Sequence, residues 1–294
     1  MTQIAFIGLG HMGLPMVQNL LRRGHVVNVF DVMPAAITQA VNAGAIAATS
    51  VADAVAKADV IFTMLQTGQQ VESVCLGEQG IFAKAKRGAL YIDSSSIEVT
   101  ISQALHQAAL VAGLKMLDAP VSGGVTGASN ATLTIMVGGD ATVFSEAEPL
   151  LKILGKKIIH AGSAGLGQAA KICNNLILGI SMIAVSEGFA LAEKLGLDPK
   201  KFFEISSNAS GQCWSMTSYC PYPGLVESAP SNRDYEAGFM TKMMLKDLRL
   251  AQHAAESAHA AIPLGAEAAE LFALLEQQGK GEKDFSSIIQ MLLK

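Results

Sequence analysis

Residues 4–13 read Ile4-Ala5-Phe6-Ile7-Gly8-Leu9-Gly10-His11-Met12-Gly13, an apolar run followed by three glycines in the spacing G-x-G-x-x-G. The spacing alone is weak, because glycine-rich loops meet it by chance. Here a strand-like run precedes it, a helical pattern follows it, and a second strand-like run comes at Val26–Phe30. In that context Gly8 permits the tight turn, Gly10 lets a pyrophosphate approach the backbone, and Gly13 lets helix and strand pack closely.

Asp31 follows the second strand-like run. A carboxylate at this place accepts hydrogen bonds from both hydroxyls of an adenosine ribose and repels a 2′-phosphate. Val32 and Met33 come next, so no adjacent arginine favours that phosphate. The alternative is a structural glycine turn beside a solvated aspartate. The sequence therefore predicts an NAD-binding Rossmann domain with these cofactor-binding candidates: Gly8, Leu9, Gly10, His11, Met12, Gly13 and Asp31.

The composition suits a folded chain of about two ordinary domains. Of its 294 residues, 50% are hydrophobic and only 16% are charged. This balance excludes intrinsic disorder and indicates a large buried surface. A formal net charge of −4, without a basic stripe, argues against a nucleic-acid partner.

The sequence offers neither a disulfide framework nor a metal site. Its four cysteines are far apart without a C-x-x-C pair, and its six histidines include no H-E-x-x-H. The chain enters a strand-like run by Ile4, without the basic region or cleavage site of a targeting segment. Leu176–Val185, the most membrane-like stretch, is too short to span a bilayer. We therefore expect a cytoplasmic protein with no membrane partner and no metal.

Strand-like and helical patterns alternate in the first half of the chain, which predicts an α/β fold with a parallel sheet covered on both faces. Strands are expected at Ile4–Ile7, Val26–Phe30, Val60–Thr63, Leu90–Asp93, Lys115–Asp118, Thr132–Val137 and Lys157–His160, and helices at Met12–Arg23, Pro34–Ala43 and Thr100–Ala112. A long apolar helical pattern covers residues 166–195, and further helices follow, apart from an irregular loop at Ser206–Asn232. The expected domains are 1–163, a Rossmann domain, and 164–294, an all-α domain for substrate and dimerisation, joined by the long helix.

A second glycine-rich segment reads Asp118-Ala119-Pro120-Val121-Ser122-Gly123-Gly124, at the carboxyl end of an expected strand. Successive backbone N–H groups in a Ser-Gly-Gly turn can form a nest for a carboxylate, with the Ser122 hydroxyl as a further donor. The alternative is a connector whose glycines only satisfy turn geometry. The residues alone leave both interpretations open.

One lysine stands alone in the long apolar pattern. Lys171 is the only charged residue between Gly165 and Val185, and Asn175 lies one helical turn later on the same face. Most such lysines extend their ammonium group to solvent. A lysine held in apolar surroundings instead has a lowered pKa, as a proton-transfer role requires. Lys171 and Asn175 are therefore the candidate catalytic residues.

Taken together, these segments resemble the β-hydroxyacid dehydrogenase family, relatives of 6-phosphogluconate dehydrogenase. The resemblance spans essentially the whole chain and is carried by Gly8-Leu9-Gly10-x-Met12-Gly13-x-Pro15-Met16, Asp118–Gly124, Lys171-x-x-Asn174-Asn175 and Lys246-Asp247-Leu248. Three further segments are most similar to family members that oxidise 3-hydroxyisobutyrate: Ser210–Ser215, Pro221–Gly224 and Lys283–Ser287.

The resemblance implies a role for each matching position. Lys171 would be the general acid/base, and Asn175 would orient the substrate beside it. The implied substrate-carboxylate contacts are Ser122, Gly123 and Gly124, and the implied further cofactor contacts are Leu65, Gln66, Ser96 and Lys246. Trp214 would provide an apolar wall for the substrate, with Phe239 as a second candidate. The alternative is that Trp214 only anchors a core or an interface.

The chain departs from the family pattern at three places. Ser96 stands where threonine is usual and keeps the hydroxyl, whereas Gln66 replaces a usual proline and puts the rigidity of its loop in doubt. Val17 occupies a position that is more often small, which concerns packing only. None of these changes affects the proposed proton-transfer residues.

The resemblance implies NAD-dependent oxidation of (S)-3-hydroxyisobutyrate to methylmalonate semialdehyde, a step in valine breakdown, by a homodimer or homotetramer. The alternative within the family is a reductase of tartronate semialdehyde or succinic semialdehyde, which would share Lys171 and Asn175. A non-catalytic dinucleotide-binding module would be expected to lack Lys171.

Overall fold

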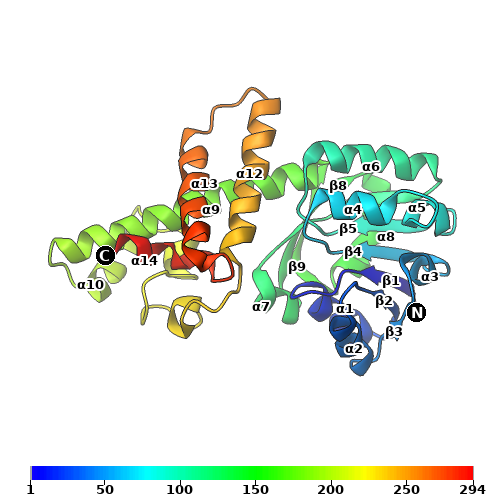
Figure 1. The fold of residues 1–294 in the computed structure, drawn as a ribbon, viewed down its shortest axis with the longest axis horizontal. Helices are drawn as coiled ribbons and strands as arrows, with labels where there is room; N and C mark the ends of the chain where they lie inside the picture. Colours follow the sequence, from blue (N-terminus) through cyan, green and yellow to red (C-terminus); the bar gives the residue numbers. More distant parts are fainter. Residues whose placement is uncertain (1, 294) are drawn as a thin grey trace. The chain divides into compact units, whose positions relative to one another are not determined.

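The computed structural model describes residues 2–293, which form two compact units that divide after Lys171 (Figure 1). The sequence places the domain boundary after residue 163, just before the long helix. In the structure the division lies inside that helix, α9 (Leu166–Lys194), so its first turn and a half belong to the amino-terminal unit. The carboxyl-terminal unit contains the rest of α9 and the residues that follow.

Within the described chain, nine strands form a single sheet in the amino-terminal unit. They are β1 (Gln3–Ile7), β2 (Val26–Phe30), β3 (Ile46–Ala47), β4 (Val60–Thr63), β5 (Leu90–Asp93), β6 (Lys115–Asp118), β7 (Val121–Ser122), β8 (Leu133–Gly139) and β9 (Gly155–Gly162). Their spatial order is β3-β2-β1-β4-β5-β6-β8-β7, with β9 beside β8. All pairs from β3 to β6 are parallel.

Both faces of this sheet are buried, because successive side chains of a strand point to opposite faces. In β1, Ile4 and Phe6 join one core cluster, while Ala5 and Ile7 join the other. The helices over the first cluster are α1 (Gly13–Arg22), α2 (Pro34–Asn42), α7 (Gly124–Ser129) and α8 (Ala141–Leu151). Those over the second are α3 (Val51–Val55), α4 (Gly68–Cys75), α5 (Ile81–Lys84) and α6 (Val99–Val111). This arrangement confirms the predicted α/β class, and Figure 1 shows α1 and α2 on the side of the sheet opposite to α4 and α6.

The sheet is parallel from β3 to β6, as expected, but β8 runs antiparallel to both β6 and β7. The chain reverses direction through β7 and α7 before it enters β8, and the Met136 N–H donates to the Pro120 carbonyl across this reversal at 3.0 Å. Ser122 consequently ends a short strand, paired with Thr134, and does not lie in an open loop.

The connections of the sheet change direction between β1 and β4. These two strands are neighbours, although the chain passes through β2 and β3 between them. Open α/β sheets bind their ligands at the carboxyl ends of strands that flank such a change. The loops that leave β1 and β4 meet at this edge, where the Met64 N–H donates to the Ile7 carbonyl at 2.9 Å.

The carboxyl-terminal unit is helical, as predicted. Besides α9, it contains α10 (Pro199–Ser206), α11 (Trp214–Thr217), α12 (Thr241–Ser257), α13 (Pro263–Leu275) and α14 (Ile289–Leu292). One core cluster packs Met182 of α9 against Leu248 of α12 and Phe272 of α13. The expected irregular segment 206–232 begins at the last residue of α10 and contains α11, and it otherwise consists of turns and loops, with a short 3-10 turn beginning at Pro230.

The helix α9 is long and apolar enough to cross a membrane, judged by length and composition alone. The stretch Leu176–Val185, singled out in the sequence as too short to span a bilayer, is only part of this helix. In its most apolar window, 44% of the residues are buried inside the protein. Buried polar side chains, among them Gln168 and Asn175, also interrupt its apolar surface, as is typical of a core helix.

Candidate active site

The turn between β1 and α1 requires glycine at two positions. Gly8 has a φ of +91°, in the region that favours glycine, and a Cβ there would overlap the Met64 carbonyl oxygen. A Cβ on Gly13 would overlap the carbonyl oxygen of Gly8. The first and third glycines of the motif therefore serve the turn and the close packing of helix on strand, as their spacing predicts.

Gly10 differs from these two glycines, because open space surrounds it. Apart from Gly10 and its two chain neighbours, no atom of the described residues lies within 4 Å of the place that a Gly10 Cβ would take, and Gly10 and His11 are both exposed. No described side chain caps the amino terminus of α1 at Met12. The N–H groups of a helix amino terminus favour an anion, so residues 8–13 fit the pyrophosphate of a dinucleotide.

Asp31 is tied to this glycine turn by its carboxylate. Its Oδ2 accepts a hydrogen bond from the Leu9 N–H at 2.7 Å, and its Oδ1 accepts one from the Met33 N–H at 2.8 Å. Each carboxylate oxygen has a second lone pair, so the group can still accept the two hydroxyls of a ribose. The structure thus brings Asp31 and the turn together, as the sequence predicts.

The remaining cofactor candidates of this unit lie at the carboxyl ends of β4 and β5. The Leu65 N–H donates to the Ser95 hydroxyl at 2.9 Å, and Ser96 is half-buried beside it. The Gln66 N–H donates to the side chain of Gln70 in α4 at 3.0 Å. This hydrogen bond restrains the loop, which lacks the family's usual proline. These residues share the sheet edge at which the glycine turn lies.

Ser122, Gly123 and Gly124 form the junction between β7 and α7. Gly123 has a φ of +133° and Gly124 one of +61°, so both positions favour glycine. Gly123 is exposed and Ser122 is half-buried. A connector and a carboxylate nest both use such a bend, so the role in substrate binding remains a proposal.

Lys171 lies in the second turn of α9 and is 8% exposed. Two residues that the sequence analysis assigned no role, Asp118 and Gln168, hold the preceding turn of this helix. Both could have been suspected from their types. Asp118 is an acid at the carboxyl end of a buried strand, and Gln168 is a polar residue one turn before Lys171 in an apolar helix.

Asn175 belongs to a buried polar cluster of the carboxyl-terminal unit. Its Nδ2 donates to Oδ2 of Asp247 at 2.5 Å, and its Oδ1 accepts from Asn174 at 2.9 Å. Asp247, on α12, is also paired with Lys246 at 3.1 Å. Asp247 therefore fixes the orientation of the Asn175 amide. This role of Asp247 was not predicted from the sequence, although Asp247 interrupts the apolar face of α12.

Trp214 and Phe239 belong to one aromatic cluster. Trp214 is 49% exposed and lies flat on Tyr219, with ring centroids 4.8 Å apart. Tyr219 contacts Phe285 at 5.5 Å, and Phe285 contacts Phe239 edge-on at 5.6 Å. The two candidates for the substrate wall are thus connected through two further rings.

The loop that carries Phe239 is anchored by Asp284. Oδ2 of this buried carboxylate accepts the N–H groups of Gly238 and Phe239, each at 3.0 Å, and the Tyr219 hydroxyl at 2.8 Å. Burial raises the pKa of Asp284 above its usual range. Burial also raises the pKa of Tyr219, so the Tyr219 hydroxyl is a hydrogen-bond donor and not a proton-transfer group at ordinary pH.

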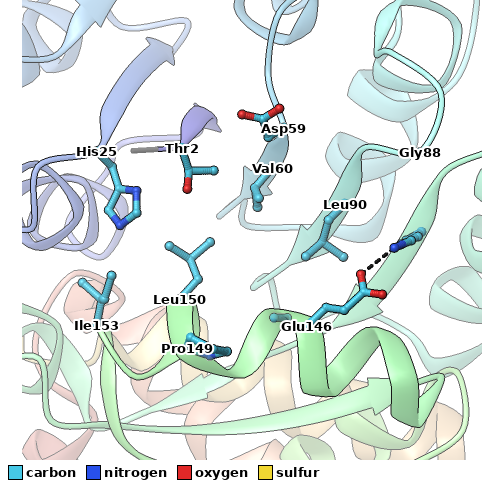
Figure 2. A pocket seen from close by; sticks show the side chains of 12 residues that line it. Thr2, His25, Asp59, Val60, Gly88, Leu90, Glu146, Pro149, Leu150 and Ile153 are labelled. Atoms are coloured by element: carbon cyan, nitrogen blue, oxygen red, sulfur yellow. Dashed lines mark hydrogen bonds and ion pairs between the residues drawn. The ribbon is translucent and has the colours of Figure 1, made fainter.

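A cavity of about 430 Å³ lies at the opposite end of the strands, at their amino ends (Figure 2). Its walls include Val60 and Leu90, at the amino ends of β4 and β5, and Leu150 of α8. Lys115 and Glu146 form an ion pair of 2.5 Å at its margin. Because dinucleotides bind at the carboxyl ends of such strands, this cavity is not part of the candidate active site.

Comparison with known proteins assigns both parts of the chain. A family model described as the NAD binding domain of 6-phosphogluconate dehydrogenase matches residues 3–162. A second, described as NAD-binding of NADP-dependent 3-hydroxyisobutyrate dehydrogenase, matches residues 165–292.

Whole-length relatives agree with these matches. A Pseudomonas aeruginosa protein named NAD-dependent L-serine dehydrogenase is 48% identical, over 99% of this chain and 98% of its own. The human mitochondrial 3-hydroxyisobutyrate dehydrogenase is 43% identical, over 99% of this chain and 87% of its own. A solved structure of Mycobacterium tuberculosis 3-hydroxyisobutyrate dehydrogenase with L-serine is 46% identical, covers 100% of both chains and superposes with a TM-score of 0.94.

Proposed function

The chain belongs to the β-hydroxyacid dehydrogenase family, and from that premise we propose that it oxidises (S)-3-hydroxyisobutyrate to methylmalonate semialdehyde with NAD. The observation that carries the proposal is Lys171, a nearly buried lysine at the start of α9. Asn175 follows it by one helical turn, with its amide oriented by Asp247. A buried amine beside a fixed amide suits proton transfer to and from a hydroxyl group.

Each step of the proposed reaction has a residue assigned to it. Ser122 and the N–H groups of Gly123 and Gly124 bind the substrate carboxylate. Lys171, in its neutral form, accepts the proton of the substrate hydroxyl while Asn175 orients that hydroxyl. The hydride leaves the carbon that bears this hydroxyl, and bound NAD would supply its acceptor. In the reverse direction, protonated Lys171 returns its proton to the forming alkoxide.

L-serine is a second candidate substrate. It shares the hydroxymethyl group and the carboxylate of 3-hydroxyisobutyrate and carries an ammonium group in place of the methyl group. The relative named L-serine dehydrogenase and the solved structure with L-serine favour this candidate. The aromatic cluster around Trp214 favours the methyl group, because an apolar wall gains by burying it.

A substrate panel tests the proposal. We expect 3-hydroxyisobutyrate to give the highest kcat/KM with NAD, measured as NADH formation, and 3-hydroxypropionate a lower one. Glycerate and 4-hydroxybutyrate, the reduced forms of tartronate and succinic semialdehyde, should be poor. If L-serine is the best substrate, the second candidate replaces the first. If none of these acids is oxidised, the proposed function is wrong.

Replacement of Lys171 tests the mechanism. Lys171→Ala should lower kcat by about 10²- to 10⁴-fold, the usual contribution of a positioned acid/base, and leave NAD affinity close to normal. Lys194→Ala is a matched control, because Lys194 is exposed at the other end of the same helix. A Lys171→Ala enzyme with half of the normal turnover would contradict the proposed role.

We further propose that the enzyme acts in the cytoplasm, in valine breakdown, as a homodimer or homotetramer. Ile177 and Leu191 of α9 are 66% and 61% exposed, and a second subunit would cover such side chains. Light scattering coupled to size-exclusion chromatography measures the subunit number. A monomer at micromolar concentration would contradict the proposed assembly.

A further inference from the structure

The amino terminus of α9 is capped by a carboxylate from another element. Asp118 ends β6 and is fully buried. Its Oδ1 accepts the Gly165 N–H at 2.8 Å and lies 2.9 Å from Nε2 of His106. Its Oδ2 accepts the Gln168 N–H at 3.0 Å. A carboxylate placed here satisfies N–H groups that a helix cannot pair internally and interacts favourably with the helix dipole.

Glycines let the first turn of α9 approach this carboxylate closely. A Cβ on Gly167 would lie 2.7 Å from the Asp118 carbonyl oxygen and 2.6 Å from that of Met136. A Cβ on Gly138 would lie 2.6 Å from both carboxylate oxygens of Asp118. Because Gly138 and Gly167 carry no side chain, this turn lies directly against the backbone of β6 and β8 and against the Asp118 carboxylate.

The side chain of Gln168 bridges the same turn to the loop after β5. Its Nε2 donates to the Ser95 carbonyl at 2.8 Å, and its Oε1 accepts the Ile97 N–H at 3.1 Å. The side chain is fully buried, so both ends of the amide are used. An ionised acid at this position would lose the donor, and an apolar residue would leave two backbone groups unpaired.

Gln168 therefore connects three parts of the candidate active site. Its backbone is bound to Asp118, which begins the segment leading to Ser122. Its side chain binds backbone groups on both sides of Ser96, at Ser95 and Ile97. The Ser95 hydroxyl in turn accepts the Leu65 N–H. Lys171 follows it by three positions on the same helix.

We propose that Gln168 is a positioning residue, which fixes the position of Lys171 relative to the loop of Ser95–Ile97 and so relative to the cofactor. The inference rests on the proposed roles of Lys171 and Ser96. Gln168 contacts neither substrate nor cofactor in this scheme, and acts through the helix turn that it shares with Lys171. A displacement of about 1 Å in a reacting group can lower a rate by about 10²-fold.

Two variants test this role, Gln168→Met and Gln168→Glu. Gln168→Met keeps the length of the side chain and loses both hydrogen bonds. We expect its kcat to fall at least 10-fold, with KM for the hydroxy acid and Kd for NAD changed less than threefold. Thermal unfolding above the assay temperature shows that the variant is folded. A defect of folding alone would lower the active fraction and the stability, without this split between kcat and KM.

Gln168→Glu adds a pH signature. Its protonated carboxyl can donate to the Ser95 carbonyl as the amide does, and its carboxylate cannot. The ratio of its kcat to that of the wild type should therefore rise as the pH falls, whereas the ratio for Gln168→Met should stay flat. Gln103→Met is the matched control, because Gln103 is exposed and donates a long hydrogen bond of 3.5 Å to the Ala164 carbonyl near the start of α9. Its kcat should be unchanged.

The outcomes separate this inference from the proposed function. A kcat of Gln168→Met within twofold of the wild type, while Lys171→Ala is inactive, overturns the positioning role and leaves the function intact. An active Lys171→Ala enzyme overturns both. Hydrogen exchange of the NAD complex needs no turnover: Gln168→Met should exchange faster at Ile97 and at residues 168–171. Unchanged exchange at both places would overturn the bridge, whatever the substrate.

Discussion

We expect Asp31 to select NAD over NADP, because a carboxylate after the second strand of a Rossmann domain accepts ribose hydroxyls and repels a 2′-phosphate. It also holds the Leu9 N–H, so its removal would loosen the glycine turn. Asp31→Asn keeps an acceptor for that N–H and removes the charge. We expect the kcat/KM ratio of NAD to NADP to fall at least about 10-fold, which corresponds to about 1.4 kcal/mol.

The comparison is made with one hydroxy acid and both cofactors. Asp31→Ala should relax the preference too, but with weaker binding of NAD, since the turn loses its anchor. Equal use of NADP by the wild-type enzyme would show that Asp31 does not select the cofactor.

Asp93 at the end of β5 is a buried carboxyl group whose ionisation opposes folding. Burial is the largest cause that raises its pKa, from 3.8 to about 6, although Thr63 and Ser95 donate to it. A raised carboxyl pKa means that the folded state binds the proton more tightly, so stability falls as the pH rises between about 4 and 6. Raising the pH from 5 to 8 should lower the free energy of unfolding by roughly 1–2 kcal/mol through this single group.

Asp93→Asn removes this dependence and keeps the acceptor for Thr63. Urea unfolding measures the free energy of unfolding of both proteins at pH 5 and pH 8. The stability of the variant relative to the wild type should be greater at pH 8 than at pH 5 by that amount. Asp59→Asn is the control, because the Lys86 side chain holds the pKa of Asp59 below its usual range. Its difference from the wild type should be the same at both pH values. A pH-independent difference for Asp93→Asn would show that Asp93 does not titrate in this interval.

At the scale of elements, local patterns predict the strands well. The strands β2, β4, β5 and β6 begin and end at the residues expected from the sequence. The two-residue strands β3 and β7 were not expected, since so short a segment shows no alternation. The antiparallel entry of β8 was missed for a related reason: strand direction depends on pairing and not on local pattern.

The contacts that position α9 lie beyond such patterns. The sequence indicates that Asp118 ends a strand and that a helix begins near residue 166. It does not indicate that these two sites meet, because Asp118 and Gln168 are 50 positions apart. The same holds for Asn175 and Asp247, which are 72 positions apart. Their pairing follows from the order of the sheet and the packing of helices, which are tertiary properties.

For the whole molecule, cofactor and substrate recognition depend on different kinds of information. The cofactor candidates lie mainly in the amino-terminal unit, where a continuous motif around Gly8 and Asp31 predicts them. The candidates for substrate selection lie in the carboxyl-terminal unit, in an aromatic cluster assembled from distant positions. The resemblance indicated Trp214 and Phe239, whereas Tyr219 and Phe285, which join them, were found only in the structure.

The choice between the two candidate substrates can be traced to Trp214. A methyl group in an apolar pocket contributes about 1–3 kcal/mol to discrimination, so 3-hydroxyisobutyrate should exceed 3-hydroxypropionate by roughly 10-fold or more in kcat/KM. Trp214→Ala should remove most of this difference, and Trp214→Leu, which keeps an apolar surface, should retain much of it. An ammonium group interacts instead with the π face of the ring, so selection of L-serine through Trp214 would be lost in both variants. If neither variant changes the ratio of the methylated to the unmethylated acid, Trp214 serves only to pack on Tyr219, and the specificity must come from other residues.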